Sequence, residues 1–172
     1  HGGRGWPVSP MTTLAAARPN FKRAGFSSNP TVFGAILRGE LPAAVLYEDD
    51  EVLAFRDAHP VSEHHYLVIP KALVPHAAAM TSADMPLLRK LVRVATQIAR
   101  ANGVEDVSLA RDAGTLSMGF HRWPFITVSH LHLHLIWPHP ASMCIKAWQH
   151  PAKNGWLYPS PEKVAQWVGE EL

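Results

Sequence analysis

The sequence predicts an α+β domain with a mostly antiparallel, five-stranded sheet, a short N-terminal helix and a long covering helix. Three observations lead to this prediction. Five short runs have strand-like composition, the first three follow one another through short turns, and a long amphipathic pattern then precedes the last two. With 172 residues, of which 47% are hydrophobic, the chain can bury the core of one ordinary domain.

The first elements are a short helix and a hairpin. Helical spacing and a stop at Gly39 define the helix, whose apolar residues are Val32, Phe33, Ile36 and Leu37. Two β-prone runs, 44–47 and 52–55, flank an acidic turn at 48–51 and indicate a hairpin. A third apolar strand is expected at 66–69, before Pro70.

The longest helix comes next, with Thr81 or Ser82 as its cap and Pro86 in its first turns. One apolar stripe runs along it: Leu88, Leu91, Val92, Ala95 and Ile98. Asn102-Gly103 ends this helix, which we expect to cover the sheet. Further strands are predicted at 107–110 and 125–137, and a last helix at 161–169.

Composition divides the chain into three parts. Residues 1–39 contain no Asp or Glu, and we interpret 1–30 as a disordered or targeting tail. The folded domain is predicted at 31–138, and 139–172 is predicted to be a C-terminal extension that packs on it. The acid-free tail would direct the protein to mitochondria if it is a transit peptide, and otherwise we expect a cytoplasmic or nuclear location.

Charge and cysteine content exclude several classes of partner. A formal net charge of +2 predicts no nucleic-acid surface, and no apolar run approaches the roughly 18 residues that span a membrane. The lone Cys144 excludes an intrachain disulfide framework and a zinc site built on several thiolates. We therefore expect a soluble protein that needs no such crosslink.

The segment 130–136 carries the clearest functional signal. Histidines occupy its first, third and fifth positions, and aliphatic residues fill every gap: His130, Leu131, His132, Leu133, His134, Leu135 and Ile136. Alternation with period two predicts a strand whose leucines face the core and whose imidazoles face one cavity. Imidazole is both nucleophilic and able to exchange protons near neutral pH, so this strand is a candidate active site.

Three interpretations fit such a row of imidazoles. A metal site is one, but alternate strand residues lie about 6.6–6.8 Å apart, so zinc would need further ligands such as His64 or His65. The rings could instead be polar groups on a solvated face. The third is covalent catalysis at phosphorus, in which the central imidazole attacks and its neighbours orient it and bind the phosphate.

Residues 130–136 match the histidine-triad motif, His-φ-His-φ-His-φ-φ with φ hydrophobic, and the chain resembles the HIT superfamily. Segments 31–42, 45–57 and 64–71 are similar to the amino-terminal half of its Hint branch, the histidine triad nucleotide-binding proteins. Segment 118–121, Ser129 and the tail after Lys146 resemble the third Hint subgroup more weakly. The resemblance implies a HIT-like fold over about 31–138.

The resemblance also implies an activity, the hydrolysis of purine nucleoside 5′-phosphoramidates (adenosine 5′-monophosphoramidase) through a nucleotidyl-histidine intermediate. By motif position His132 is the nucleophile, His134 contacts the phosphate and leaving group, and His130 and His65 support them. The implied nucleotide-binding residues are Phe33, Ile36, Phe55, Asp57, Ala58 and Thr127. Thr127 stands about where many Hint proteins have a serine, and a bend would be needed to bring it to the phosphate.

Other implications concern partners and metals. A purine nucleotide substrate and a homodimer are expected by resemblance, with no cofactor; Thr31 and Gly34 replace a zinc-binding Cys pair of some relatives, so no structural metal is expected. A diadenosine polyphosphate hydrolase of the Fhit type and a nucleotide-binding module with little turnover remain as alternatives. The aprataxin type is less consistent, because its Cys/His finger is not visible here. The other histidines are interpreted as loop or surface residues: His59, His76, His121, His139 and His150.

Overall fold

The computed structural model describes residues 29–139 and 156–172, and within them the predicted α+β architecture is confirmed. A five-stranded sheet has the order β1-β2-β3-β5-β4, and each neighbouring pair is antiparallel. Its strands are β1 (Val45–Glu48), β2 (Val52–Arg56), β3 (His64–Pro70), β4 (Ser117–Gly119) and β5 (Leu133–Trp137). The helices are α1 (Val32–Arg38), α2 (Met85–Ala101), α3 (Val107–Asp112) and α5 (Pro161–Trp167), with 3₁₀ turns η1 (Ala77–Ala79) and η2 (Ser82–Asp84).

Local capping explains where the predicted helices begin and end. Thr31 caps α1 through its side chain, and Gly39 ends the helix with a left-handed φ of 75° that favours glycine. Before α2, Thr81 forms a capping box with Asp84 around η2, and the regular helix starts at Met85. The helix ends before Asn102, as predicted.

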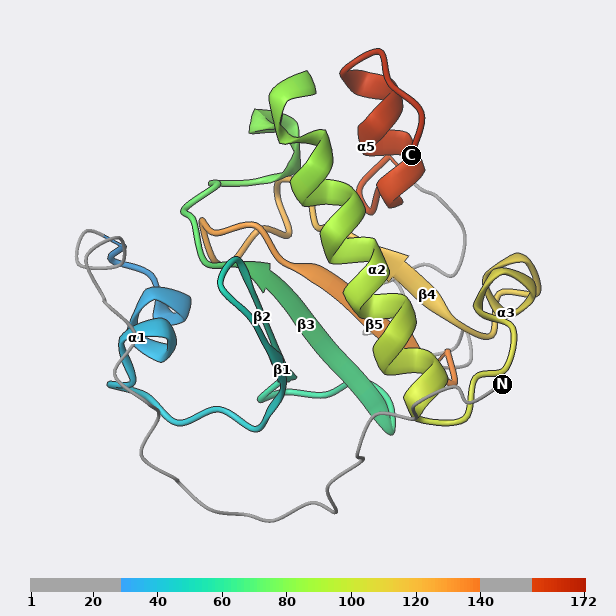
Figure 1. Cartoon of the computed structure of the whole chain (residues 1–172), viewed down its shortest axis with the longest axis horizontal. Helices are drawn as coiled ribbons and strands as arrows, with labels where there is room; N and C mark the ends of the chain where they lie inside the picture. Colours follow the sequence, from blue (N-terminus) through green and yellow to red (C-terminus); the bar gives the residue numbers. More distant parts are fainter. Residues whose placement is uncertain (1–28, 140–155) are drawn as a thin grey trace, which may run out of the picture.

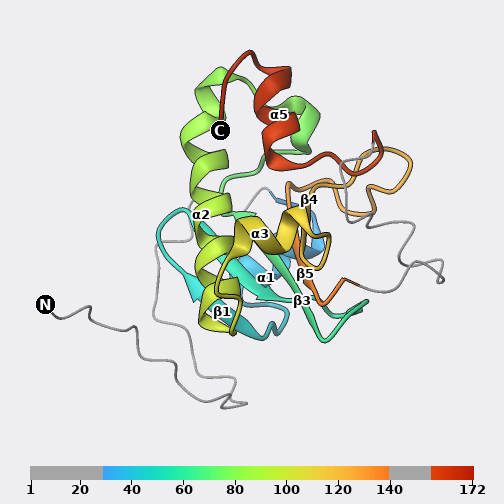
Figure 2. The same ribbon diagram turned by 90° about the vertical axis from the view of Figure 1, so that its right-hand side faces the viewer.

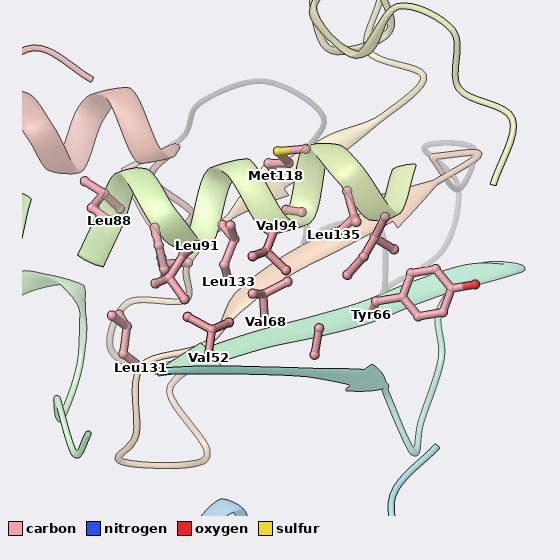
Figure 3. Close-up of a cluster of buried hydrophobic side chains, with 14 of the residues drawn as sticks. Val52, Tyr66, Val68, Leu88, Leu91, Val94, Met118, Leu131, Leu133 and Leu135 are labelled. Carbon is pink, nitrogen blue, oxygen red and sulfur yellow. The ribbon is translucent and has the colours of Figure 1, made fainter. Parts of the chain in front are cut away.

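The two faces of the sheet carry separate apolar clusters. One face packs against α2, and Figure 3 shows the leucines of 130–136 among the side chains of that cluster: Val52, Tyr66, Val68, Leu88, Leu91, Val94, Met118, Leu131, Leu133 and Leu135. The opposite face packs against α1 through a smaller cluster: Phe33, Ile36, Leu37, Leu53, Phe55, Leu67 and Ile69. Figure 1 shows α2 lying along the sheet and α1 on the other side of β2. The α1 face is therefore the one to which alternate residues such as His65 and His134 belong.

Two predicted strands differ from the observed elements. Residues 107–110 belong to α3, because Asp106 caps a helix by accepting a hydrogen bond from the Leu109 N–H. The fifth strand is instead β4, a short segment that pairs with β5 through Ser117–Gly119. The predicted strand 125–137 is regular only from Leu133 onward.

The C-terminal segment returns to the domain. Helix α5, predicted at 161–169, begins after the cap Ser160 and contacts α2 and η1. Figures 1 and 2 both place it beside the first half of α2. Arg111 of α3 forms two 2.7 Å hydrogen bonds with the Glu162 carboxylate and so ties α5 to the domain.

The boundary of the predicted tail needs one correction. Residues 1–28 lie outside the described residues, as do 140–155 with Cys144 and His150. Asn29, however, is 2% exposed and bonded within the domain, so the folded part begins before residue 31. Among the described residues, no helix is long and apolar enough to cross a membrane.

Candidate active site

The first two triad histidines lie outside the regular strand. In the register of β3 and β5, Val68 pairs with Leu133, so Leu131 would come opposite Pro70. Proline has no backbone N–H to donate, and the ladder ends there. The Leu131 N–H donates instead to the Val74 carbonyl at 2.6 Å. The segment before Leu133 therefore leaves the sheet and carries His130 and His132 toward the α1 face.

His130 is a fully buried ring with a defined hydrogen-bond pattern. Its exposure is 0%, its Nε2 lies 2.8 Å from the Pro70 carbonyl oxygen, and the Asn29 Nδ2 donates to its Nδ1 at 2.8 Å. The orientation of the Asn29 amide follows from Thr31, whose N–H and hydroxyl both donate to its Oδ1. An amide nitrogen only donates, so His130 is assigned a proton on Nε2 and none on Nδ1.

His132 is oriented by the backbone of His130. Its Nδ1 lies 2.7 Å from the His130 carbonyl oxygen, an acceptor, so Nδ1 carries the proton. In the neutral ring the lone pair then resides on Nε2, the nitrogen that a nucleophile needs. Its edge-on neighbours are the rings of Phe33 and His134, with centroids 5.3 and 4.9 Å away.

A second chain of hydrogen bonds fixes His134. The Val61 N–H donates to His65 Nδ1 at 3.3 Å, so the His65 proton is on Nε2. That nitrogen lies 2.9 Å from His134 Nδ1 and 3.4 Å from a carboxylate oxygen of Asp57, two acceptors around one donor. His134 therefore carries its own proton on Nε2. The triad offers one lone pair, on His132, and one N–H donor, on His134.

His64 and His65 occupy opposite faces of β3, as adjacent strand residues must. His64 stacks on Trp137 with ring centroids 4.4 Å apart and lies 3.0 Å from the Tyr66 hydroxyl. Both of those partners belong to the cluster under α2. Only His65 faces the triad, which makes His64 a matched control residue for the site.

The predicted nucleoside-binding residues differ in burial and in the elements that carry them. Phe33, Ile36 and Phe55 form one buried cluster, in which Phe33 meets the rings of Phe55, His130 and His132 edge-on. Asp57 follows β2 on the same side and receives the His59 N–H at 2.8 Å. Ala58 and Thr127 are exposed, and Thr127 lies in the irregular segment where strand alternation does not set its direction.

Sequence reasoning missed the contacts of His121. It was interpreted as a loop or surface residue and does lie in a loop, but its ring is partly buried, with its centroid 4.3 Å from that of His134 and 6.2 Å from that of His132. One ring nitrogen from each of these three histidines lies within 4.8 Å of the other two. Asn29 was missed as well, because it was assigned to the tail. The similarity of segment 118–121 to the third Hint subgroup was the sequence signal that could have indicated a role for His121.

Burial controls the charge state of the site. It lowers the pKa of His132, against the opposing effects of the His130 carbonyl and Asp57. Burial likewise lowers the pKa values of His130 and His65, with Asp57 opposing it at His65. The lowered pKa values favour the neutral form of all three rings at pH 7. The three triad members are 0%, 7% and 4% exposed, which rules out the solvated-face interpretation.

These lowered pKa values predict acid sensitivity of the fold. The unfolded chain takes up protons at these histidines below about pH 6.5, whereas the folded chain takes them up only at lower pH. The free energy of unfolding should therefore decrease as pH falls through 6.5. We expect a lower urea midpoint at pH 5.5 than at pH 7.5.

A carboxylate contribution can be separated from this effect. Burial raises the pKa of Glu162, but hydrogen bonds from Arg111 outweigh it and lower that pKa to about 2. The stability that this ion pair contributes is lost only below about pH 4.5, where an unfolded glutamate protonates. A urea midpoint that stayed constant from pH 7.5 to 5.0 would contradict the assigned neutral histidines.

Two groups of side chains have metal-ligand spacing. They are His121 with His132 and His134, and Asp57 with His65 and His134. Imidazole nitrogens suit zinc, so the first group has the donor set for such an ion. In the assigned tautomers, His132 has its lone pair on Nε2 and His134 has its proton on Nε2.

Comparison with known proteins identifies the family. The family profile described as scavenger mRNA decapping enzyme C-term binding matches residues 30–149. The structure is similar to a HIT family hydrolase from Clostridium thermocellum, with a TM-score of 0.56 and 26% identity over 67% of this chain and 94% of that one. The same holds for a HIT family hydrolase from Legionella pneumophila, with a TM-score of 0.52 and 33% identity over 61% and 89%. The chain belongs to the HIT superfamily.

Sequence relatives place it within the superfamily. It is 36% identical over 109 residues to adenosine 5′-monophosphoramidase HINT3 of Danio rerio, covering 63% of this chain and 64% of that protein. It is 34% identical over 110 residues to the purine nucleoside phosphoramidase of Escherichia coli, covering 64% and 88%. The chain is a member of the Hint branch. The match spans less than two thirds of the zebrafish relative's length.

Proposed function

We propose that this protein hydrolyses the P–N bond of purine nucleoside 5′-phosphoramidates through a covalent nucleotidyl-histidine intermediate. The observation that carries the proposal is the pair of fixed tautomers. His132 presents a lone pair on Nε2, and His134 beside it carries a proton on Nε2. A phosphoryl group needs both, a nucleophile for phosphorus and a donor for its oxygens. The names of the zebrafish and E. coli relatives support the same reaction.

The reaction has two balanced steps. His132 Nε2 attacks phosphorus, a new P–N bond forms to the imidazole, and the P–N bond to the amine breaks as the amine nitrogen takes a proton from a general acid. Water then attacks phosphorus and gives one proton to the conjugate base of that acid, the bond to His132 breaks, and the nucleoside monophosphate leaves with the hydroxyl group. The neutral state of His132, which its burial favours, is required for the first step.

A substrate panel tests this proposal. Purified protein would be incubated with AMP-lysine, AMP-morpholidate and diadenosine triphosphate. We expect release of AMP from the two phosphoramidates, and rapid quenching should reveal protein whose mass has increased by one nucleotide. Faster turnover of diadenosine triphosphate would replace the proposal with a Fhit-like hydrolase. Nucleotide binding without turnover of any compound would replace it with a binding module.

Asp57 is proposed to accept hydrogen bonds from the ribose hydroxyls. Asp57→Asn keeps the shape and the oxygen that receives the His59 N–H, but it removes the charge. Because hydrogen bonds to a charged group contribute about 1.5–3 kcal/mol, we expect KM for AMP-morpholidate to rise about 10-fold. The kinetic comparison should be repeated with a 2′,3′-dideoxy substrate. An equal effect on both substrates would show that Asp57 acts elsewhere, for example through His65.

A homodimer is proposed on the resemblance to the Hint branch. In the described part of the sheet, β1 and β4 are the edge strands, and the exposed apolar side chains Val45 and Leu46 lie on β1. Light scattering coupled to size-exclusion chromatography would measure the mass in solution. A monomer at micromolar concentration would contradict this part of the proposal.

A further inference from the structure

We propose that His121 is a further catalytic residue that protonates the leaving amine, and that the C-terminal segment 156–160 holds it in place through Tyr158. This inference rests on the proposed function and deepens it. It assigns the proton that P–N cleavage needs to a residue outside the triad. It also gives the C-terminal segment a part in the active site.

The position of His121 supports this role. One of its ring nitrogens lies within 4.8 Å of one ring nitrogen of His132 and one of His134. A tetrahedral phosphoryl group that contacts two of these nitrogens is therefore within reach of the third. The ring planes of His121 and His132 are nearly perpendicular, at 84°, whereas His121 packs obliquely on His134 at 48°. His121 and His132 also line the same pocket.

The fixed tautomer of His134 makes this residue a poor proton donor to the amine. Its Nδ1 accepts the proton of His65, so its Nε2–H can donate a hydrogen bond to a phosphoryl oxygen. Transfer of that proton to an amine would leave an anionic ring unless His65 gave up its own proton at the same time. His121 is a loop residue on the other side of His134 from His65, and as an imidazolium it would become a neutral ring on giving up one proton. It is the better placed acid for the amine nitrogen.

The C-terminal segment holds the backbone around His121. The Phe120 N–H donates to the Pro159 carbonyl, and the Arg122 N–H donates to the Leu157 carbonyl, both at 3.0 Å. These two backbone hydrogen bonds fix the chain on either side of His121. Between these bonds stands Tyr158, whose ring is 2% exposed and lies with its centroid 5.6 Å from that of His121. The same ring lies 6.2 Å from that of His134.

Gly119 makes room for this arrangement. A Cβ atom at residue 119 would lie 2.4 Å from Cε1 of Tyr158, closer than real Cβ contacts allow. The absence of a side chain at the end of β4 thus lets the Tyr158 ring pack close to the rings of His121 and His134. The Arg122 guanidinium, directly after His121, lies 4.6 and 4.9 Å from the ring centroids of Trp156 and Trp167. Tyr158 is accordingly a positioning residue.

The chemistry of the step is balanced. As His132 forms its bond to phosphorus, the His121 imidazolium transfers a proton to the amine nitrogen, the P–N bond breaks, and a neutral amine leaves. In the second step neutral His121 accepts a proton from the attacking water. The imidazolium is then restored for the next cycle. No other reactant is needed.

Leaving-group dependence tests the role of His121. AMP-morpholidate requires a protonated nitrogen, whereas adenosine 5′-(p-nitrophenyl) phosphate expels a stable phenolate. We expect His121→Gln to lower kcat/KM for the morpholidate by about 10²- to 10⁴-fold, the range of general acid catalysis, and for the phenyl ester by less than about 10-fold. His64→Gln, the same change on the opposite face of β3, should affect neither substrate.

The outcomes distinguish a catalytic role of His121 from a structural one. Equal losses on both substrates would assign His121 to packing alone, and no loss on either would remove it from the reaction. A wild-type protein that cleaves neither phosphoramidates nor the ester would overturn the proposed function itself, which is a different result. Tyr158→Leu should reproduce the substrate-selective loss of His121→Gln, and Tyr158→Phe, which keeps the ring, should retain the selectivity of the wild type. Unselective loss in a folded Tyr158→Leu variant, verified by circular dichroism, would overturn the positioning role.

Discussion

Replacement of His132 by alanine is expected to abolish turnover while leaving nucleotide binding largely intact. The imidazole is the group that would form the bond to phosphorus, and its Nδ1–H bond to the His130 carbonyl directs the lone pair of Nε2 into the site. His134 keeps its proton and its bond to His65 in the variant, but it cannot take over, because its lone pair is engaged by that bond. Loss of a catalytic nucleophile costs up to about 10⁶-fold in kcat, and we expect at least about 10⁴-fold.

The measurement combines two readouts. Single-turnover kinetics with AMP-morpholidate would give the rate, and calorimetric titration with AMP would give the Kd, which should change by less than about 10-fold because the proposed nucleoside contacts of Phe33 and Asp57 remain. His64→Ala serves as the control, since His64 faces the α2 side of the sheet. A His132→Ala variant with normal turnover would exclude imidazole attack. If turnover persisted only with added zinc and vanished with a chelator, a metal mechanism would replace it.

The face assignment of the triad could be predicted from sequence because alternation is a local property. Leu133 and Leu135 lie under α2 and His134 on the α1 side, as period two requires. The start of the strand could not be predicted in this way. It depends on Pro70, a residue far away in sequence that ends the ladder and whose carbonyl faces the His130 ring at 2.8 Å.

Residues were missed where their role depends on distant contacts. Asn29 has the composition of the tail around it, and only the fold brings its amide to His130, 101 residues away. Val107 begins a run with strand propensity, yet Asp106 caps it as a helix. His121 lacks any periodic pattern, and its place beside His134 is set by backbone pairing with the C-terminal segment. The Asp106 cap is a local contact between residues three apart, whereas the contacts of Asn29 and His121 are tertiary and are not carried by the local sequence.

The second large effect is expected from replacing His65, which does not face the phosphorus directly. His65→Leu removes the donor that fixes the tautomer of His134. The freed ring can then place its proton on Nδ1 and present a lone pair to the phosphoryl oxygens, which repel it. A supporting residue of this kind typically contributes about 10- to 100-fold in activity, and a wrong tautomer can cost more. We expect kcat for AMP-morpholidate to fall by about 100-fold.

His65→Gln provides the matched comparison. A glutamine amide can donate to His134 Nδ1, and its carbonyl oxygen can accept the Val61 N–H that His65 Nδ1 now receives at 3.3 Å. The tautomer of His134 is thereby preserved, so Gln should retain at least 10-fold more activity than Leu. Both variants lose the imidazole, its aromatic packing on His134 and its interaction with Asp57. Equal activities of the two would mean that the packing of His65, and not its proton, supports His134.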